Sequence, residues 1–394
     1  MLAEALRLTT SQEDIDELTA QLEAELKECE ATTVSYKNKL KQFMMENDIW
    51  QISELNYYWR EKYCEYLKNR MSKTSCELYI KTFDRVKLHS LRKQPQIILA
   101  GKRQRLEYAD EILYLPYHPN IEIAERFCRE NNKNLLAWDF TLIAAEKLKR
   151  QIFQVLHYFI ENAANSERMH AQLGGLARLY DFCILEQIED LEKLEIDQIE
   201  RFQKTFTTEY QRHYYAGVTY WCGRALFMEA EEIHWDANVW YMERMHLQPE
   251  RIDPAAPIMS LSFAEVTNKE NRKLLQKYLR YGIGIANLSI SSLRTEFLVV
   301  RKFLGDMNQP ETENICMVTE QQMDAWLRSE QQREVQADTF NKKVMCILHF
   351  FQYLQIKDYI TAIPFDPNYY LKKTFMQHHD RSVAQETMDQ IRRN

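Results

Sequence analysis

Apolar residues recur at alternating three- and four-residue spacing in two segments near the carboxyl end of the chain. In 289–304 they are Ile290, Leu293, Phe297, Val300 and Leu304. In 338–354 they are Phe340, Val344, Ile347, Phe351 and Leu354. Because this spacing stacks side chains on one helical face, the stretch Ile285–Leu354 is predicted to form a helix, a break, a short helix and a last helix.

The positions outside these two stripes carry hydroxyls, amides and cations, the groups that contact phosphates and base edges. On the first helix they are Ser291, Ser292, Arg294, Thr295, Arg301 and Lys302. On the last helix they are Thr339, Asn341, Lys342, Lys343 and His349. Each helix therefore pairs a face that seeks the core with a face suited to binding nucleic acid.

The rest of the chain shows mostly helical periodicity. An acidic helix is predicted over 11–30, capped by Ser11 with Asp14, either leaning on a neighbouring helix or facing a partner. Ser53, and Ser72 or Thr74, are predicted to cap helices within 33–93. A short strand is predicted at 96–100, a loop or helix break at Gly174-Gly175, and a further helix at 271–281.

Composition favours an all-α, multi-domain protein. The 394 residues include only 8 Gly and 9 Pro, which disfavours turn-rich β architectures. The eight cysteines form no C-x-x-C pair, so reduced thiols in the cytoplasm are expected. No apolar run is long enough for a membrane span, and no signal peptide begins the chain.

Charge is distributed unevenly. Basic and acidic residues number 2 and 9 in 1–30, 16 and 7 in 31–105, 16 and 28 in 106–270, and 17 and 14 in 271–394. The net charge of −7 therefore conceals two regions with a basic surplus, and in physiological salt the local charge matters more than the sum.

These patterns predict five parts, which are an acidic N-terminal helix (1–32), a basic helical domain (33–105), an acidic helical middle domain (106–265), a DNA-binding domain (266–370) and a linker (371–394). The basic residues of 33–105, interleaved with tyrosines, indicate either an ordinary exposed face or a second DNA contact. The acidic middle is assigned to spacing, protein contact or assembly.

Three segments resemble the core-binding domain of tyrosine-type site-specific recombinases of the phage-integrase superfamily. They are Ser289–Leu298, then Val318-Thr319-Glu320 with Trp326-Leu327, and Thr339–Lys343 with His349–Leu354. The whole chain also resembles the amino-terminal part of long, transposon-encoded members. The matching segments there are Asn134–Phe140, Trp235–Tyr241 and Asp380–Val383.

The resemblance implies a SAM-like four-helix core-binding domain that holds double-stranded DNA for recombination or integration, with protomers self-associating as a tetramer on DNA. Lys372 and Lys373 would follow the DNA backbone where the chain crosses to a catalytic domain. That domain, with its nucleophilic tyrosine, is expected to be absent, so the chain alone should not cut DNA and needs no cofactor. His378-His379-Asp380-Arg381 spells the H-x-x-R string of the family's active site, but its position indicates coincidence.

Two alternatives belong to other functional classes. A protein-binding helical scaffold would use the acidic middle as its working surface. A di-iron helical-bundle enzyme would use the pairs Glu231…His234 and Glu243…His246, although eight residues between the pairs are too few for two antiparallel helices. Sequence motifs of phosphate loops, dinucleotide folds and serine hydrolases are absent.

Overall fold

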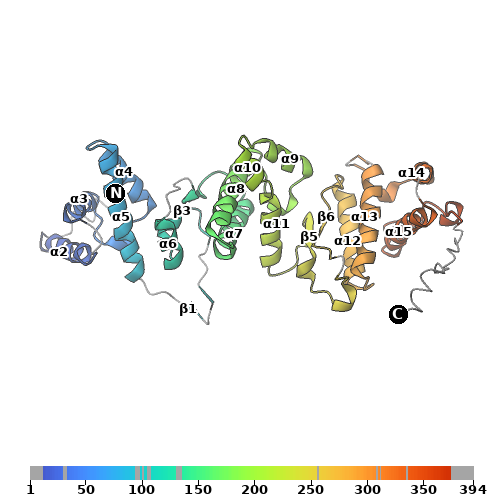
Figure 1. The fold of residues 1–394 in the computed structure, drawn as a ribbon, viewed down its shortest axis with the longest axis horizontal. Helices are drawn as coiled ribbons and strands as arrows, with labels where there is room; N and C mark the ends of the chain where they lie inside the picture. The colour runs from blue at the N-terminus through green and yellow to red at the C-terminus, as the bar shows by residue number, and fades with distance from the viewer. Residues whose placement is uncertain are drawn as a thin grey trace, which may run out of the picture. The chain divides into compact units, whose positions relative to one another are not determined.

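The structure is a computed structural model and is mostly helical, as expected (Figure 1). It describes residues 12–29, 33–93, 98–99, 102–103, 108–129, 135–254, 257–307, 309–310, 312–333 and 336–373. The chain divides into two compact units. Unit 1 comprises Met1–Leu191 and Phe202–Ala225, and unit 2 comprises Glu192–Arg201 and Leu226–Asn394. The five parts proposed from composition are finer than these units and stay a prediction.

The first part of unit 1 is a helical layer around an aromatic core. Its helices are α2 (Gln12–Glu28), α3 (Val34–Glu46), η1 (Ile52–Glu54), α4 (Tyr57–Lys68) and α5 (Lys73–Lys93). Leu22, Phe43, Tyr63 and Phe83 are fully or almost fully buried between them. The acidic helix α2 thus leans on its neighbours, and its Ser11 cap lies outside the described residues.

Helix starts in this region differ partly from expectation. Asn56, and not Ser53, caps α4, because its side-chain oxygen accepts a hydrogen bond from the Trp59 amide. Ser53 lies three residues too early, inside η1. Ser72 accepts a hydrogen bond from the Ser75 amide at the start of α5, as predicted.

Short antiparallel strand pairs and further helices complete unit 1. The strands are β1 (Ile98–Leu99) paired with β2 (Lys102–Arg103), and β3 (Ile112–Tyr114) paired with β4 (Ala137–Asp139). The helices are η2 (Leu115–Tyr117), α6 (Ile121–Cys128), α7 (Glu146–Asn162), α8 (Ser166–Leu185) and α10 (Glu209–Tyr214). The described part of the predicted 96–100 strand, Ile98-Leu99, is a strand.

The predicted break at Gly174-Gly175 is wrong. Both glycines lie buried inside the continuous helix α8. A Cβ atom on Gly174 would lie only 2.4 Å from the hydroxyl oxygen of Tyr215. The glycines are therefore explained by close packing against a tyrosine ring, and not by a turn.

The unit boundaries fall within η4 (Leu191–Lys193), α9 (Ile196–Lys204) and α11 (Val218–Glu229). Unit 2 contains the strand pair β5 (Val239–Tyr241) and β6 (Ser260–Ser262), with η5 (Met242–Met245) and η6 (Pro249–Arg251) between them. Its later helices are α12 (Lys269–Gly284), α13 (Ile290–Met307), η7 (Ile315–Met317), α14 (Glu320–Gln332), α15 (Ala337–Ile356) and η8 (Pro367–Tyr369).

Helices α12, α13, α14 and α15 enclose the core of unit 2. Every residue of the two predicted stripes is buried there, so the order helix, break, short helix, helix is confirmed. The guanidinium of Arg272 on α12 is also buried, and it donates to Glu195 at 2.5 and 2.8 Å and to Asn238 at 2.8 Å. This arginine ties the segment 192–201 to α12.

Candidate nucleic-acid interface

Most of the predicted DNA-binding residues of α13 lie on its exposed side. Ser291, Ser292, Arg294 and Thr295 are all exposed. The Thr295 hydroxyl donates to the Ser291 carbonyl at 2.9 Å, and the Ser292 amide donates to Ser289 at 3.2 Å. Arg294 makes no hydrogen bond or ion pair with any residue that the structure describes, so its charge faces solvent unbalanced.

A buried carboxylate organises two of the other predicted cations. The Glu330 side chain on α14 is only 1% exposed, and it accepts from Lys302 of α13 at 2.8 Å and from Lys343 of α15 at 2.7 Å. Arg333 also pairs with it, and Lys302 reaches Asp306 at 2.9 Å. We call Lys302, Glu330, Arg333 and Lys343 the Glu330 cluster.

The Glu330 cluster joins three helices and keeps a positive surplus. Burial alone raises the pKa of Glu330, but hydrogen bonds from Lys302 and Lys343 outweigh burial and hold the pKa below its ordinary value. The carboxylate is therefore charged at neutral pH. Three cations share one buried anion, and Lys302 also pairs with Asp306, which is exposed. Lys302 and Lys343 thus have a packing role in addition to any DNA contact.

The predicted linker cations are partly held in place. The side-chain amide of Asn341 on α15 makes two hydrogen bonds of 2.9 Å with the backbone of Lys372. The Lys372 ammonium donates to the Gln331 carbonyl at 3.2 Å and lies 4.9 Å from the ring centre of Phe340. Thr339 and Lys373 are exposed. The segment up to Lys373 therefore adds cations beside the Glu330 cluster.

Arg301 differs from the other predicted contacts. Its guanidinium is half-buried, pairs with Glu265 at 2.8 Å and lies over the Phe297 ring. Its charge is balanced within unit 2, so it is less available to a phosphate than Arg294.

Helix α15 and the residue that follows it carry a row of basic groups. Lys342 and His349 are exposed and lie seven residues apart, about two helical turns, and the exposed C-cap residue Lys357 follows eight residues later. Asp338, in the first turn, is the single acidic residue of the α15 sequence. This basic row therefore runs along most of the helix without a carboxylate of its own.

At the far end of the row, Lys357 lines a hollow of about 510 Å³ together with Lys277 and Arg280. Tyr281, Tyr353 and Trp235 also line it, and its lining residues include no carboxylate. Sequence analysis did not select Lys277, Arg280 or Lys357. The seven- and eight-residue spacing from Lys342 through His349 to Lys357 was a signal that could have found the last of these.

His349 sits in a polar link between three helices. Its Nδ1 atom lies 2.8 Å from Glu296 of α13, and the other carboxylate oxygen accepts from the Tyr278 hydroxyl of α12 at 3.0 Å. The hydrogen bond to Glu296 raises the pKa of His349 above its ordinary value. The imidazole therefore gains charge more readily than a free histidine.

The basic residues of 33–93 have several environments. Lys41 pairs with Glu23 and Lys93 pairs with Glu28. Lys87, one of the basic residues of 33–105, is buried and donates to the Ser53 carbonyl at 2.7 Å, and burial lowers its pKa to about 8. Part of the basic surplus is thus used within unit 1. The side chains of Lys102, Arg103 and Arg105 lie outside the described residues.

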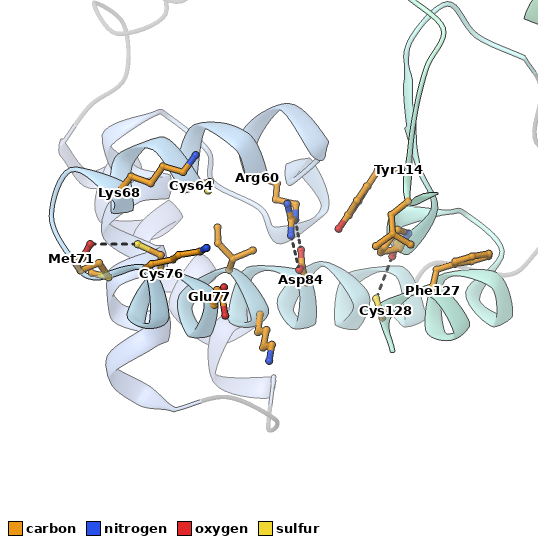
Figure 2. A pocket seen from close by; sticks show the side chains of 15 residues that line it. Arg60, Cys64, Lys68, Met71, Cys76, Glu77, Asp84, Tyr114, Phe127 and Cys128 are labelled. Atoms are coloured by element: carbon orange, nitrogen blue, oxygen red, sulfur yellow. Dashed lines mark hydrogen bonds and ion pairs between the residues drawn. The ribbon is translucent and has the colours of Figure 1, made fainter. Parts of the chain in front are cut away.

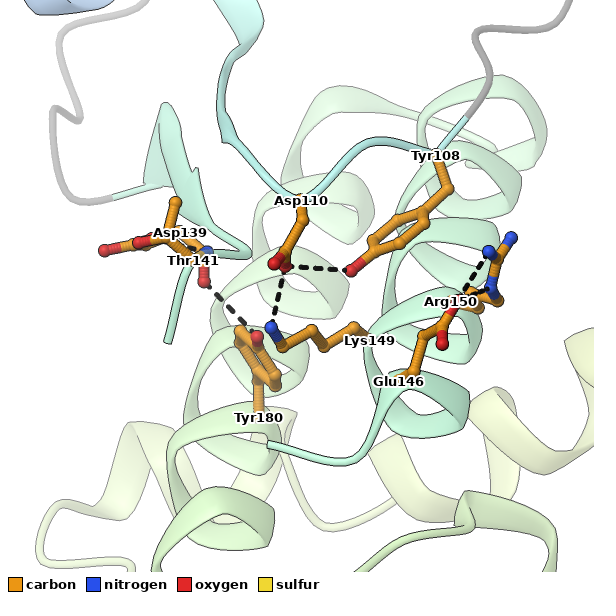
Figure 3. Close-up of polar contacts among 8 residues, drawn as sticks. All are labelled: Tyr108, Asp110, Asp139, Thr141, Glu146, Lys149, Arg150 and Tyr180. Atoms are coloured by element: carbon orange, nitrogen blue, oxygen red, sulfur yellow. Dashed lines mark hydrogen bonds and ion pairs between the residues drawn. The ribbon is translucent and has the colours of Figure 1, made fainter. Parts of the chain in front are cut away.

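Unit 1 contains a polar cluster whose residue types are those of a catalytic site, but whose side chains hydrogen-bond to one another and to the backbone (Figure 3). The buried Lys149 ammonium donates to Asp110 at 2.7 Å, and the Tyr108 hydroxyl donates to the same carboxylate at 3.2 Å. The Tyr180 hydroxyl donates to the Asp139 carbonyl at 3.2 Å. Each of these polar groups already has a hydrogen-bond partner within the cluster. The cluster therefore connects the region of strands β3 and β4 to helices α7 and α8.

The di-iron alternative gains no support. His234 pairs with Glu192 at 2.7 Å, and Glu231 lies with it in a loop outside any regular helix. Glu243 and His246 lie in and after the short helix η5. Within the described ranges, no group of three or more His, Cys, Asp or Glu side chains is placed to hold a metal ion.

The His378–Arg381 string lies outside the described residues. Across the part of the chain that the structure covers, no helix combines the length and apolar character that crossing a bilayer requires.

Comparisons with protein-family models, with curated proteins and with solved structures returned no match. The resemblance to tyrosine recombinases therefore stays a prediction based on the residues quoted above.

Proposed function

We propose that this chain is the DNA-binding portion of a tyrosine-type recombinase, which holds duplex DNA for recombination or integration. The observation that supports this best is the basic row on α15, formed by Lys342, His349 and Lys357. Backbone binding to DNA needs cations that are exposed and not balanced by nearby carboxylates. Lys342 and Lys357 make no hydrogen bond or ion pair with a residue in the described part of the chain, whereas Glu296 partly balances His349.

The dimensions of the row suit a duplex. Lys342 and Lys357 are fifteen residues apart, which corresponds to about 22 Å along a helix. One DNA strand rises 3.4 Å per nucleotide, so the row spans about six base pairs. Arg294 and the hydroxyls of Ser291, Ser292 and Thr295 would contact the groove and phosphates from α13. Lys373 would continue the contact along the backbone.

In this proposal α12, α13, α14 and α15 form the SAM-like four-helix core-binding domain. The Glu330 cluster would hold Lys302 and Lys343 in place while its positive surplus attracts phosphate. The proposal includes self-association on DNA and a cytoplasmic location. The basic helices of 33–105 would add a second contact.

The test is fluorescence anisotropy with a random-sequence 30-base-pair duplex at several salt concentrations, because phosphate contacts do not depend on sequence. The full chain is expected to show a steep loss of affinity with salt. Lys342→Ala with Lys357→Ala should lower the slope of log affinity against log salt by about 1.8, since each phosphate contact contributes about 0.9.

The matched control is Lys193→Ala with Lys273→Ala. These exposed lysines already pair with Asp236 and Glu270 at 2.6 and 2.7 Å. Their loss should leave the slope almost unchanged. An affinity without salt dependence, or an equal effect of both double variants, would overturn the DNA interface on α15. Absence of any binding would favour the protein scaffold.

A further inference from the structure

Unit 1 contains a pocket of about 840 Å³ that lies outside the proposed DNA interface on α13 and α15. It follows the groove between α4 and α5, and the segment Tyr114–Pro116, helix α6 and Leu136 close it. Its volume lies within the range of known small-molecule sites. Figure 2 shows Lys68 and Met71 at one end of the groove, with Phe127 and Cys128 at the other.

The floor of the pocket is apolar. Ile80, Phe127 and Leu136 are buried side chains that also line the pocket, as are Cys76 and Pro116. The thiol of Cys128 is directed to the Pro116 carbonyl at 3.5 Å, and burial raises its pKa to about 12. The thiol is therefore neutral, and it adds to the apolar character of this end.

An ion pair joins the two helices that form the groove, and its charges balance each other. Arg60 of α4 donates to both carboxylate oxygens of Asp84 on α5, at 2.8 and 3.2 Å. The Tyr117 hydroxyl donates to the same carboxylate at 2.5 Å. The Arg60 charge is thus balanced, and the pair fixes the spacing of the two helices in the middle of the pocket (Figure 2).

The mouth of the pocket has a different charge balance. Lys68, Lys73 and Lys81 line it and are exposed, and none of them makes a hydrogen bond or ion pair with a residue in the described part of the chain. Glu77 is the one carboxylate of the lining besides Asp84. Three ammonium groups therefore border an apolar groove, and the single charge of Glu77 cannot balance all three.

We propose that this pocket binds a small amphipathic anion. Its carboxylate, phosphate or sulfonate group sits between Lys68 and Lys73, and its apolar body follows the groove past Ile80 toward Phe127 and Leu136. Because α5 rises about 16 Å between Lys73 and Asp84, the body is elongated. Burial of that body supplies the affinity, and the lysines select the sign of the charge.

The test uses dodecanoate as the probe, below its micelle concentration, with the full chain in isothermal titration calorimetry. Dodecanoate is expected to bind at least tenfold more tightly than dodecanol or dodecyltrimethylammonium, which share its apolar chain. The variant Lys68→Gln with Lys73→Gln and Lys81→Gln should lose at least tenfold in affinity. The control Lys37→Gln with Lys39→Gln and Lys62→Gln changes the net charge equally outside the pocket, and it should bind as the unmodified chain does.

A second readout locates the ligand independently of these variants. Cys64 lines the pocket and is half-buried, whereas Cys316, which is also half-buried, lies in unit 2. Dodecanoate should slow alkylation of Cys64 several-fold, measured by peptide mass spectrometry, and leave Cys316 unchanged. Equal binding of dodecanol and dodecanoate, equal losses in both triple variants, or unchanged alkylation of Cys64 would each overturn the proposal.

Discussion

The Nδ1 atom of His349 on α15 lies 2.8 Å from a carboxylate oxygen of Glu296 on α13. Through its other oxygen, Glu296 also accepts from Tyr278 of α12. One carboxylate, with a side chain that is only 11% exposed, therefore links three helices of unit 2. The link makes both the stability of this unit and the charge of its basic row depend on pH.

Stability should fall as the pH rises through the pKa of His349. The folded-state pKa lies above the unfolded value of about 6.5, mainly because Glu296 stabilises the imidazolium. The protonated pair is therefore fully present below pH 6.5 and is lost as the pH rises through the higher folded-state pKa. Because His349 is about half exposed, we expect a loss of up to about 1 kcal/mol, measured by urea unfolding at a series of pH values.

The control for this pH dependence is His349→Gln. Glutamine can still donate a hydrogen bond to Glu296 but does not titrate between pH 5 and 9. The variant should show a flatter stability profile across this window than the unmodified chain. Identical profiles for the two proteins would mean that the His349 pair does not contribute to the pH dependence.

DNA affinity should show the same pH dependence if α15 faces the duplex. Protonated His349 places a third positive charge between Lys342 and Lys357, although Glu296 partly balances it. Raising the pH from 6 to 8 at constant salt should therefore weaken duplex binding two- to threefold more in the unmodified chain than in His349→Gln. Anisotropy titrations measure this difference, and parallel pH profiles would place His349 away from the DNA.

Replacing Glu330 should destabilise unit 2 by about 1 to 3 kcal/mol, because Lys343 and Arg333 lose their shared carboxylate while Lys302 keeps Asp306. Glu330→Ala separates Lys302, Lys343 and Arg333 from their shared partner. The matched control is Gln332→Ala, an exposed residue on the same helix, with an effect within about 0.5 kcal/mol. Equal unfolding midpoints of the two variants would show that the cluster adds nothing to stability.

Glu330 also separates the DNA proposal from a purely structural role. Glu330→Gln removes one negative charge beside three cations and keeps most of the side-chain volume. The folded fraction of this variant should therefore bind duplex more tightly than the unmodified chain at low salt. Unchanged or weaker binding by folded protein would indicate that Lys302 and Lys343 serve the fold alone.

The sequence allowed the helices of unit 2 to be predicted, but not the partners of their polar side chains. The stripes of α13 and α15 are local, because residues three and four apart meet on one face whatever lies elsewhere. The pairing of Lys302 with Glu330 joins residues 28 positions apart. Nothing in the surrounding Ser329-Glu330-Gln331-Gln332 distinguishes this carboxylate from an exposed one. The sequence therefore predicted which cations lie away from the core, but not that Glu330 would pair with two of them, Lys302 and Lys343.

Glycine was misread for a related reason. A glycine pair suggests a turn when local conformational freedom is considered alone. At Gly174 the deciding neighbour is Tyr215, 41 residues later, whose ring occupies the space where a side chain would be. The requirement for glycine at position 174 comes from a tertiary contact, which a local sequence pattern does not reveal.

Substitutions of two helical glycines should have opposite effects. Gly174→Ala places a methyl group 2.4 Å from the Tyr215 hydroxyl, and Tyr215 packs against Phe206 and Tyr210 at ring-centre distances of 6.2 and 5.8 Å. We expect unit 1 to lose about 1 to 2 kcal/mol, because the steric cost exceeds the gain in helix propensity. Gly305→Ala meets nothing nearer than 4.0 Å and should stabilise unit 2 by about 0.5 to 1 kcal/mol.

Hydrogen exchange read by mass spectrometry follows each unit separately and therefore measures both substitutions in one protein. Protection of α8 should fall in Gly174→Ala, and protection of α13 should rise in Gly305→Ala. Adding Tyr215→Phe to Gly174→Ala removes the oxygen that the new methyl group meets first, so part of the lost protection in α8 should return. If the double variant is no more protected than Gly174→Ala, contact with the Tyr215 hydroxyl is not what requires glycine at this position.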